Sequence, residues 1–181
     1  MSVTAFYGGW ARYQQLISNA LRSMPPDEVA LEAPFETEGS HWPIWAIAAH
    51  TAGARVYWLC LVLGEPGIET ASDFMQPETY EGWEDDLSHP RSAAEVADAF
   101  DTSWVIVADC LERWTPEMLD EPIAVDTPRG TVHYTRQSIL LRLITHDAYH
   151  AGEIALIQGA HGRSQIDLWP PGAHSLEAMA R

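Results

Sequence analysis

Four stretches of the chain carry the helical spacing of apolar residues, and this pattern limits the possible folds more than any other feature. The first stretch covers residues 6–24, where apolar side chains recur every three or four positions and so share one helix face. The second covers residues 40–63, the third starts after Ser92, and the fourth covers residues 136–158. A chain built from four such amphipathic segments is predicted to be all-α.

The segments between these helices predict how the helices are connected. Residues 27–39 and 65–90 are acidic and contain prolines, so we expect long crossovers, with one or two short helical turns within residues 79–87. Residues 123–125 and 131–134 flank the turn sequence of residues 126–130, and this arrangement predicts a small β-hairpin before the last helix. The predicted fold is therefore a four-helix bundle with long crossover connections.

Residues with known preferences for helix ends support these boundaries. Ser92 and Glu95 have the spacing of a capping box, in which each side chain accepts a hydrogen bond from the other residue's backbone N–H. Ser40 and Thr135 are the predicted N-caps of the second and fourth helices. Gly64 is the expected stop of the second helix.

The length of 181 residues fits a single domain, residues 1–181, with its core in about residues 5–160. Such a chain buries roughly 70% of its unfolded surface and needs no disulfide or metal to form a core. Residues 161–181 are expected to form an irregular tail, because Trp169 is followed by Pro170 and Pro171. Trp169 could cover the mouth of a site, although packing on the end of the bundle is the simpler interpretation.

The charge of the chain excludes several classes of function. The formal net charge is −16, and all ten basic residues are arginines. Such a protein lacks the positive surface that binds nucleic acid or an anionic membrane, so we expect neither partner. The absence of lysine also excludes a Schiff-base enzyme, a pyridoxal-phosphate enzyme with its own lysine and a P-loop nucleotide hydrolase.

Cysteine usage and hydropathy indicate the compartment. Cys60 and Cys110 lie in apolar helical patterns and form no disulfide framework, and no signal-peptide pattern opens the sequence. We therefore expect a reducing cytoplasm. Residues 42–63 are nearly long and apolar enough to span a bilayer, but His50 and Arg55 interrupt the segment. It is predicted to be a core helix with polar interruptions.

Three histidines stand where apolar residues are expected. His146 and His150 occupy two successive core-facing positions of the fourth helix, and His50 lies in the most apolar helix. Residues four apart lie on the same helix face with their side chains about 5–6 Å apart, so two imidazoles at such positions can chelate one ion. A metal would satisfy all three buried rings at once, whereas each unsatisfied polar group costs roughly 1–3 kcal/mol. Asp147, Tyr149 and Glu153 lie beside the pair and could orient the ring N–H groups.

Other interpretations of these residues stay open. The histidines could be metal-free core residues, each hydrogen-bonded to a carbonyl or a tyrosine. A di-iron carboxylate site is disfavoured, because residues 6–24 contain no carboxylate. A serine or cysteine hydrolase is disfavoured by the absence of a nucleophile-elbow pattern and by the apolar surroundings of both cysteines. The acidic segment 65–90 is expected to be solvated surface rather than part of a ligand site.

The segments around these histidines resemble the DinB-like superfamily of metal-dependent four-helix-bundle proteins. The resemblance is carried by residues 40–50, which end at His50, and by residues 143–154, which contain the His146–His150 pair. It covers most of residues 5–160, including the helix order and the long crossover. Members often have a second histidine where Tyr149 stands here.

The resemblance implies one divalent ion, zinc, nickel or manganese, held by His50, His146 and His150, with water in the open positions. It also implies a thiol S-transferase-like or hydrolase-like activity on a small molecule, with a low-molecular-weight thiol as a possible co-substrate. Arg142, one turn before His146, is a candidate contact for an acidic substrate group. No catalytic residue is assigned.

The alternative function is a non-catalytic metal-binding or stress-response bundle whose metal is structural or absent. A fourth protein ligand such as His133 would favour a closed structural site, whereas open coordination positions would favour an enzyme. Apolar residues on two sides of the second helix lead us to expect a homodimer.

Overall fold

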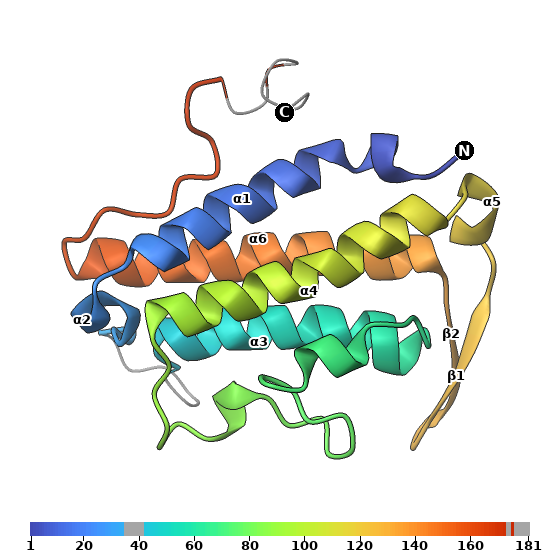
Figure 1. The fold of residues 1–181 in the computed structure, drawn as a ribbon, viewed down its shortest axis with the longest axis horizontal. Helices are drawn as coiled ribbons and strands as arrows, with labels where there is room; N and C mark the ends of the chain where they lie inside the picture. Colours follow the sequence, from blue (N-terminus) through green and yellow to red (C-terminus); the bar gives the residue numbers. More distant parts are fainter. Residues whose placement is uncertain (35–41, 173–174, 176–181) are drawn as a thin grey trace.

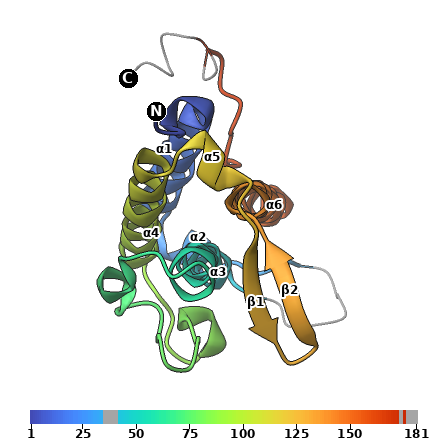
Figure 2. The same cartoon turned by 90° about the vertical axis from the view of Figure 1, so that its right-hand side faces the viewer.

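The computed structural model describes residues 1–34, 42–172 and 175, and it is mainly helical (Figure 1). Four long helices run beside one another and are called the helical body below: α1 (Gly8–Ser23), α3 (Ile44–Val56), α4 (Ala93–Arg113) and α6 (Arg136–Ala160). In the end-on view of Figure 2, α4 lies between α1 and α3, and α3 lies between α4 and α6. The predicted mainly helical class is confirmed.

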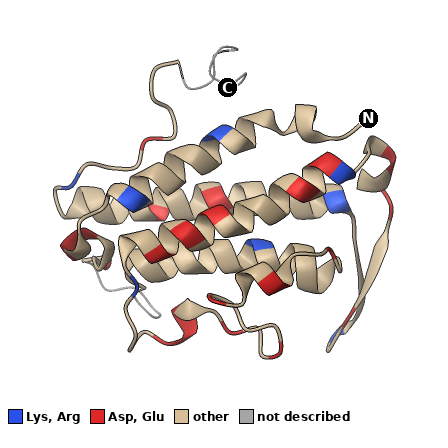
Figure 3. Ribbon diagram, viewed as in Figure 1, with Lys and Arg blue, Asp and Glu red and all other residues tan. Residues whose placement is uncertain are grey.

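Short elements connect these helices. They are the 3₁₀ turns Thr4–Phe6, Ile68–Ala71 and Trp83–Asp85, the helices α2 (Pro26–Val29) and α5 (Pro116–Leu119), and a π-helical extension of α3 over Tyr57–Val62. The turn Trp83–Asp85 falls in the stretch where the sequence predicted a short helical turn. It packs against α3, and this contact brings the long acidic segment, whose Asp and Glu residues are red in Figure 3, to the side of α3.

The predicted β-hairpin is confirmed as an antiparallel pair of strands, β1 (Ile123–Thr127) and β2 (Gly130–Tyr134). Ile123 pairs with Tyr134 at one end, and Thr127 pairs with Gly130 at the turn. Gly130 has a φ of 114°, a conformation that side chains with a Cβ rarely adopt. The hairpin leads directly into α6, as expected.

The predicted helix boundaries differ from the structure mainly in α3. Helix α3 begins at Ile44 after Pro43, and the predicted N-cap Ser40 lies outside the described residues. Ser92 and Glu95 form the predicted capping box of α4, and Thr135 caps α6 by accepting a hydrogen bond from the Ser138 N–H. Helix α6 continues to Ala160, two residues beyond the prediction.

Buried apolar side chains from all four long helices fill the centre of the helical body. Helix α3 contributes the most continuous buried surface, because small residues such as Ala48 and Ala52 let its neighbours approach closely. Helix α4 contributes Phe100 and Val107, which are 1% and 0% exposed.

Within the described residues, no helix combines the length and the hydropathy needed to cross a bilayer.

One ion pair crosses this core and ties α3 to α6. The Arg55 guanidinium is fully buried and donates hydrogen bonds to both Asp147 carboxylate oxygens, at 3.2 Å from Nε and 2.6 Å from Nη2. It also donates to the side chain of Gln14, at 2.7 Å, and stacks over the Phe100 ring at 4.0 Å. A buried charge needs such compensation. The pair fixes how α3 and α6 face each other, and so it also fixes how His50 on α3 lies relative to His146 and His150 on α6.

Candidate metal centre

His50, His146 and His150 converge between α3 and α6. One ring nitrogen from each of the three side chains lies within 4.8 Å of the others. The Nε2 atoms of His50 and His146 are 3.2 Å apart, and the His146 and His150 ring centroids are 4.4 Å apart. The sequence predicted this set from spacing on α6 and from one histidine on α3, and the structure brings all three together.

The spacing of these nitrogens fits a shared ion. An ion about 2.0–2.1 Å from two imidazole nitrogens holds them roughly 2.9–3.4 Å apart, depending on whether the angle at the ion is square or tetrahedral. The 3.2 Å separation of the His50 and His146 Nε2 atoms lies in this range. His50 and His146 therefore stand at the separation of two ligands of one ion, and a ring nitrogen of His150 lies within 4.8 Å of a nitrogen of each.

Two carboxylates set the orientation of the His50 and His150 rings. Glu84 Oε1 lies 3.2 Å from His50 Nδ1, and Glu153 Oε2 lies 2.8 Å from His150 Nδ1. A carboxylate that accepts the Nδ1 proton leaves the Nε2 lone pair free for a ligand. His146 differs, because its Nδ1 is buried without a hydrogen-bond partner among the described residues. The donor set is two imidazoles oriented by carboxylates and a third, His146, whose ring contacts His50 through Nε2 but has no partner for Nδ1 among the described residues.

The surroundings keep the α6 histidines neutral. Burial, followed by the nearby charges of His150 and His50, lowers the pKa of His146 from 6.5 to about 3. Burial also lowers the pKa of His150, although the hydrogen bond from its ring to Glu153 opposes the shift. Neutral imidazole is the form that binds a metal, so little proton release is needed near neutral pH.

Glu84 is the residue that sequence reasoning missed. The segment 65–90 was predicted to be solvated surface, and this prediction is wrong at Glu84, whose side chain is only 11% exposed. Glu84 is one of several acidic residues in the segment, and no local pattern separates it from Glu81 or Asp85. Only the docking of the turn Trp83–Asp85 on α3 selects it.

The loop around Glu84 is held in place by its own backbone. Met75 and Gly82 form an isolated antiparallel bridge, and the Gly82 N–H donates to Asp85 at 2.8 Å. A Cβ at Gly82 would collide with the Glu84 carboxylate, so glycine leaves the space that this side chain occupies. The Glu84 carboxylate thereby reaches His50 at the edge of the histidine cluster.

Asp147 has different partners from those predicted. Its carboxylate accepts hydrogen bonds from Arg55 and from the Trp10 indole N–H, at 2.7 Å for Trp10. The expectation that Asp147 orients a histidine ring is therefore wrong: it faces away from the cluster, because adjacent helix residues point about 100° apart. It acts on His150 only through its charge, which raises the pKa of that ring slightly against the larger effect of burial.

A cavity of about 220 Å³ opens beside the histidines. His50 and His146 form part of its wall, together with Glu84 and Arg142. Arg142 is exposed, and its guanidinium stacks over the Trp58 ring at 4.5 Å from the ring centroid. Two of the three imidazoles, one carboxylate and one cation therefore line this cavity, and His150 lies behind the wall that His50 and His146 form.

Comparisons with known proteins bear on this arrangement. A family model for the DinB superfamily matches residues 5–154, which include all three histidines. The chain belongs to the DinB superfamily. The resemblance inferred from the sequence is confirmed.

The fold of this DinB superfamily member is similar to a solved structure. The crystal structure of a DinB-like protein from Bacillus cereus matches with a TM-score of 0.63 at 20% sequence identity. The match covers 89% of this chain and 93% of that chain, and at this identity it shows the fold alone. No curated protein matches the chain in sequence.

The remaining candidate site residues lie at the edge of the histidine cluster or away from it. Tyr149 is exposed, with its ring edge against His150 at a centroid distance of 5.1 Å. His133 is exposed on β2 and is not among the clustered histidines that the described residues provide. Trp169 packs edge-on against Tyr13, so the interpretation of it as a cover over the histidines is wrong.

Proposed function

We propose that this DinB superfamily protein is a metal-dependent enzyme with a four-helix-bundle architecture. In this proposal His50, His146 and His150 hold one divalent ion, zinc, nickel or manganese. The observation that carries it is the convergence of three ring nitrogens within 4.8 Å, two of them on histidines that line a cavity. His133 adds no fourth ligand from its exposed strand, which favours an open site over a closed structural one.

An ion bound by three neutral imidazoles would keep its full positive charge, and would stabilise a thiolate or lower the pKa of water towards 7. The protein's own residues then have separate tasks. Glu84 and Glu153 hold the His50 and His150 rings in the tautomer that presents Nε2. Arg142 offers a cation at the cavity wall for an acidic group of the substrate.

The proposed reaction is thiol S-transfer or hydrolysis on a small molecule. The two cysteines of the chain cannot supply the thiol, because Cys60 and Cys110 are 8% and 0% exposed. Burial raises the pKa of Cys60 to about 11 and that of Cys110 to about 12. A low-molecular-weight co-substrate is therefore the proposed source of the thiol. The protein is also proposed to be a cytoplasmic homodimer.

The test is an activity screen of metal-loaded protein prepared without a polyhistidine tag. Small electrophiles are offered with glutathione or another low-molecular-weight thiol, and activated esters are offered with water alone. We expect turnover that the wild type and His133→Ala share and that His146→Ala loses. Equal turnover by His146→Ala, or none by any loaded protein, would contradict the proposal.

A further inference from the structure

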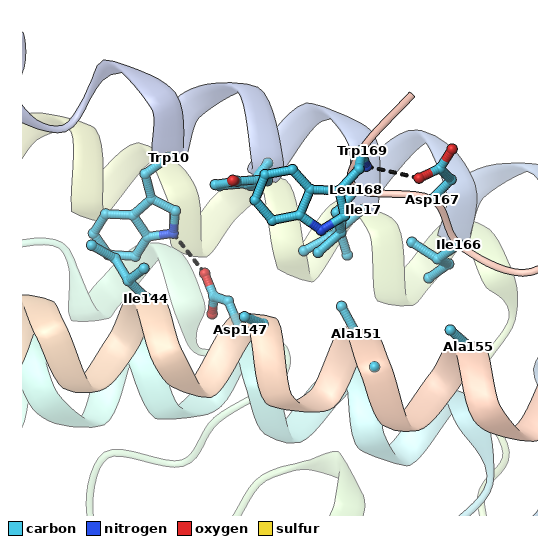
Figure 4. Close-up of a pocket in the computed structure, with 13 residues that line it drawn as sticks. Trp10, Ile17, Ile144, Asp147, Ala151, Ala155, Ile166, Asp167, Leu168 and Trp169 are labelled. Atoms are coloured by element: carbon cyan, nitrogen blue, oxygen red, sulfur yellow. Dashed lines mark hydrogen bonds between the residues drawn. The ribbon is translucent and has the colours of Figure 1, made fainter. Parts of the chain in front are cut away.

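We propose that a second site, between α1 and α6, binds a small uncharged apolar molecule. A cavity of about 430 Å³ lies there (Figure 4). Its α6 wall includes Ala151 and Ala155, which helical spacing places nearly opposite His146 and His150. The proposal therefore concerns a different face of α6 and does not rest on the proposed metal-dependent activity.

The cavity exists because α1 and α6 do not pack tightly. Figure 2 shows the two helices apart on the open side of the helical body, with the C-terminal segment beside them. Beyond Ile144 and Asp147, the α6 residues that line the cavity are small: Ala148, Ala151, Gly152 and Ala155. At one end the Trp10 indole N–H donates to Asp147 across the gap, at 2.7 Å. Beyond this bond the short side chains leave the gap unfilled.

Larger apolar side chains close the other walls. Helix α1 contributes Tyr13 and Ile17, and the chain after α6 folds back so that Ile166 and Leu168 line the cavity (Figure 4). Trp169 packs edge-on against Tyr13 with ring centroids 5.8 Å apart, and this pair forms part of the rim. The volume lies within the range of about 300–1,000 Å³ that is typical of small-molecule pockets.

The charges at the cavity point to an uncharged ligand. Asp147 is only 3% exposed and already accepts hydrogen bonds from Arg55 and Trp10. Asp167 is exposed at the rim and accepts the Trp169 backbone N–H at 2.7 Å. No cationic side chain lines the cavity among the described residues. An anion would therefore meet only carboxylates, and a cation would find the deepest carboxylate already paired with Arg55.

Gly152 offers a direct way to fill the cavity without disturbing the fold. A Cβ at this position meets no heavy atom within 4 Å, and the residue lines the cavity. Replacing a helical glycine also raises helix propensity. Gly152→Leu should block the space, whereas Gly152→Ala supplies the same gain in helix propensity with little added volume. Ala155→Leu blocks the same cavity one turn further along α6.

The experiment titrates the full chain with N-phenyl-1-naphthylamine, an uncharged apolar dye whose fluorescence rises in apolar surroundings. Wild type and Gly152→Ala should bind about one dye per chain, with energy transfer from nearby tryptophans. Gly152→Leu should weaken binding about tenfold or more at a thermal stability similar to that of Gly152→Ala, and Ala155→Leu should weaken it as much, with metal content unchanged in both. No saturable binding by the wild type, or equal binding by all four proteins, would overturn the proposal.

Discussion

The Arg55–Asp147 pair gives the sharpest prediction about stability. Asp147→Asn preserves the shape of the side chain but removes the charge that compensates a fully buried guanidinium. Removing one partner of a buried ion pair costs about 3–5 kcal/mol, because the other charge is left without compensation. For a chain of this length that corresponds to a fall in Tm of roughly 6–20 °C.

The assay is equilibrium unfolding in urea, monitored by circular dichroism, on metal-free protein. Asp98→Asn is the matched control, since it removes a carboxylate that lies 2.7 Å from Arg22 in an ion pair whose partners are 44% and 69% exposed. Exposed pairs contribute about 0–1 kcal/mol, so this control should change stability little. The double variant Arg55→Met, Asp147→Leu should recover most of the loss, because it removes both charges together.

The reasoning would be refuted if Asp147→Asn cost no more than Asp98→Asn. It would also be refuted if the double variant were less stable than Asp147→Asn. The first result would mean that the Arg55 charge is compensated by Gln14 and the Phe100 carbonyl alone. The second would mean that the pair contributes more than its charges cost to bury.

Three further predictions concern the site. First, metal-free protein should lose stability as the pH falls from about 6.5 towards 3. The reason is that His146 binds a proton in the unfolded chain, whereas burial lowers its pKa to about 3 in the folded protein. His146→Gln should flatten this part of a Tm-against-pH curve, and an unchanged slope would contradict the prediction. Second, Glu84→Ala should weaken metal binding about 10–100-fold in a competition titration with a chelator, since His50 loses its Nδ1 partner, while Glu78→Ala in the same loop should not. Third, the thiol reagent 5,5′-dithiobis(2-nitrobenzoate) should react slowly with the folded protein at neutral pH, because both cysteines are buried and their thiol pKa values are raised. Two equivalents of thionitrobenzoate per chain should be released only after denaturation. Rapid reaction of the folded protein would contradict this.

Much of the fold could be predicted because local chemistry decides it. The capping box at Ser92 and the cap at Thr135 depend on residues three positions apart, and both are present in the structure. The hairpin over residues 123–134 follows from a turn sequence between two short strand-like runs. The start of α3 was less well predicted, because Pro43 fits either the first turn of a helix or the residue before it.

The site could be predicted only as far as helix periodicity reaches. His146 and His150 share a face through their spacing, and His50 was the remaining internal histidine. Glu84 comes from a segment whose position depends on tertiary contacts with α3, so its role could not be read from spacing. The partner of Asp147 was also set by tertiary structure: helix geometry turns its side chain away from His146, but only the fold shows that Arg55 lies opposite.

The most direct test of the metal centre is the metal content of untagged protein, measured by inductively coupled plasma mass spectrometry. We predict about one divalent ion per chain for the wild type and for His133→Ala, and loss of that ion in His50→Ala, His146→Ala and His150→Ala. The contradicting result is a wild type that takes up no zinc, nickel or manganese after reconstitution. The 3.2 Å contact between the His50 and His146 Nε2 atoms would then be a hydrogen bond between two neutral imidazoles.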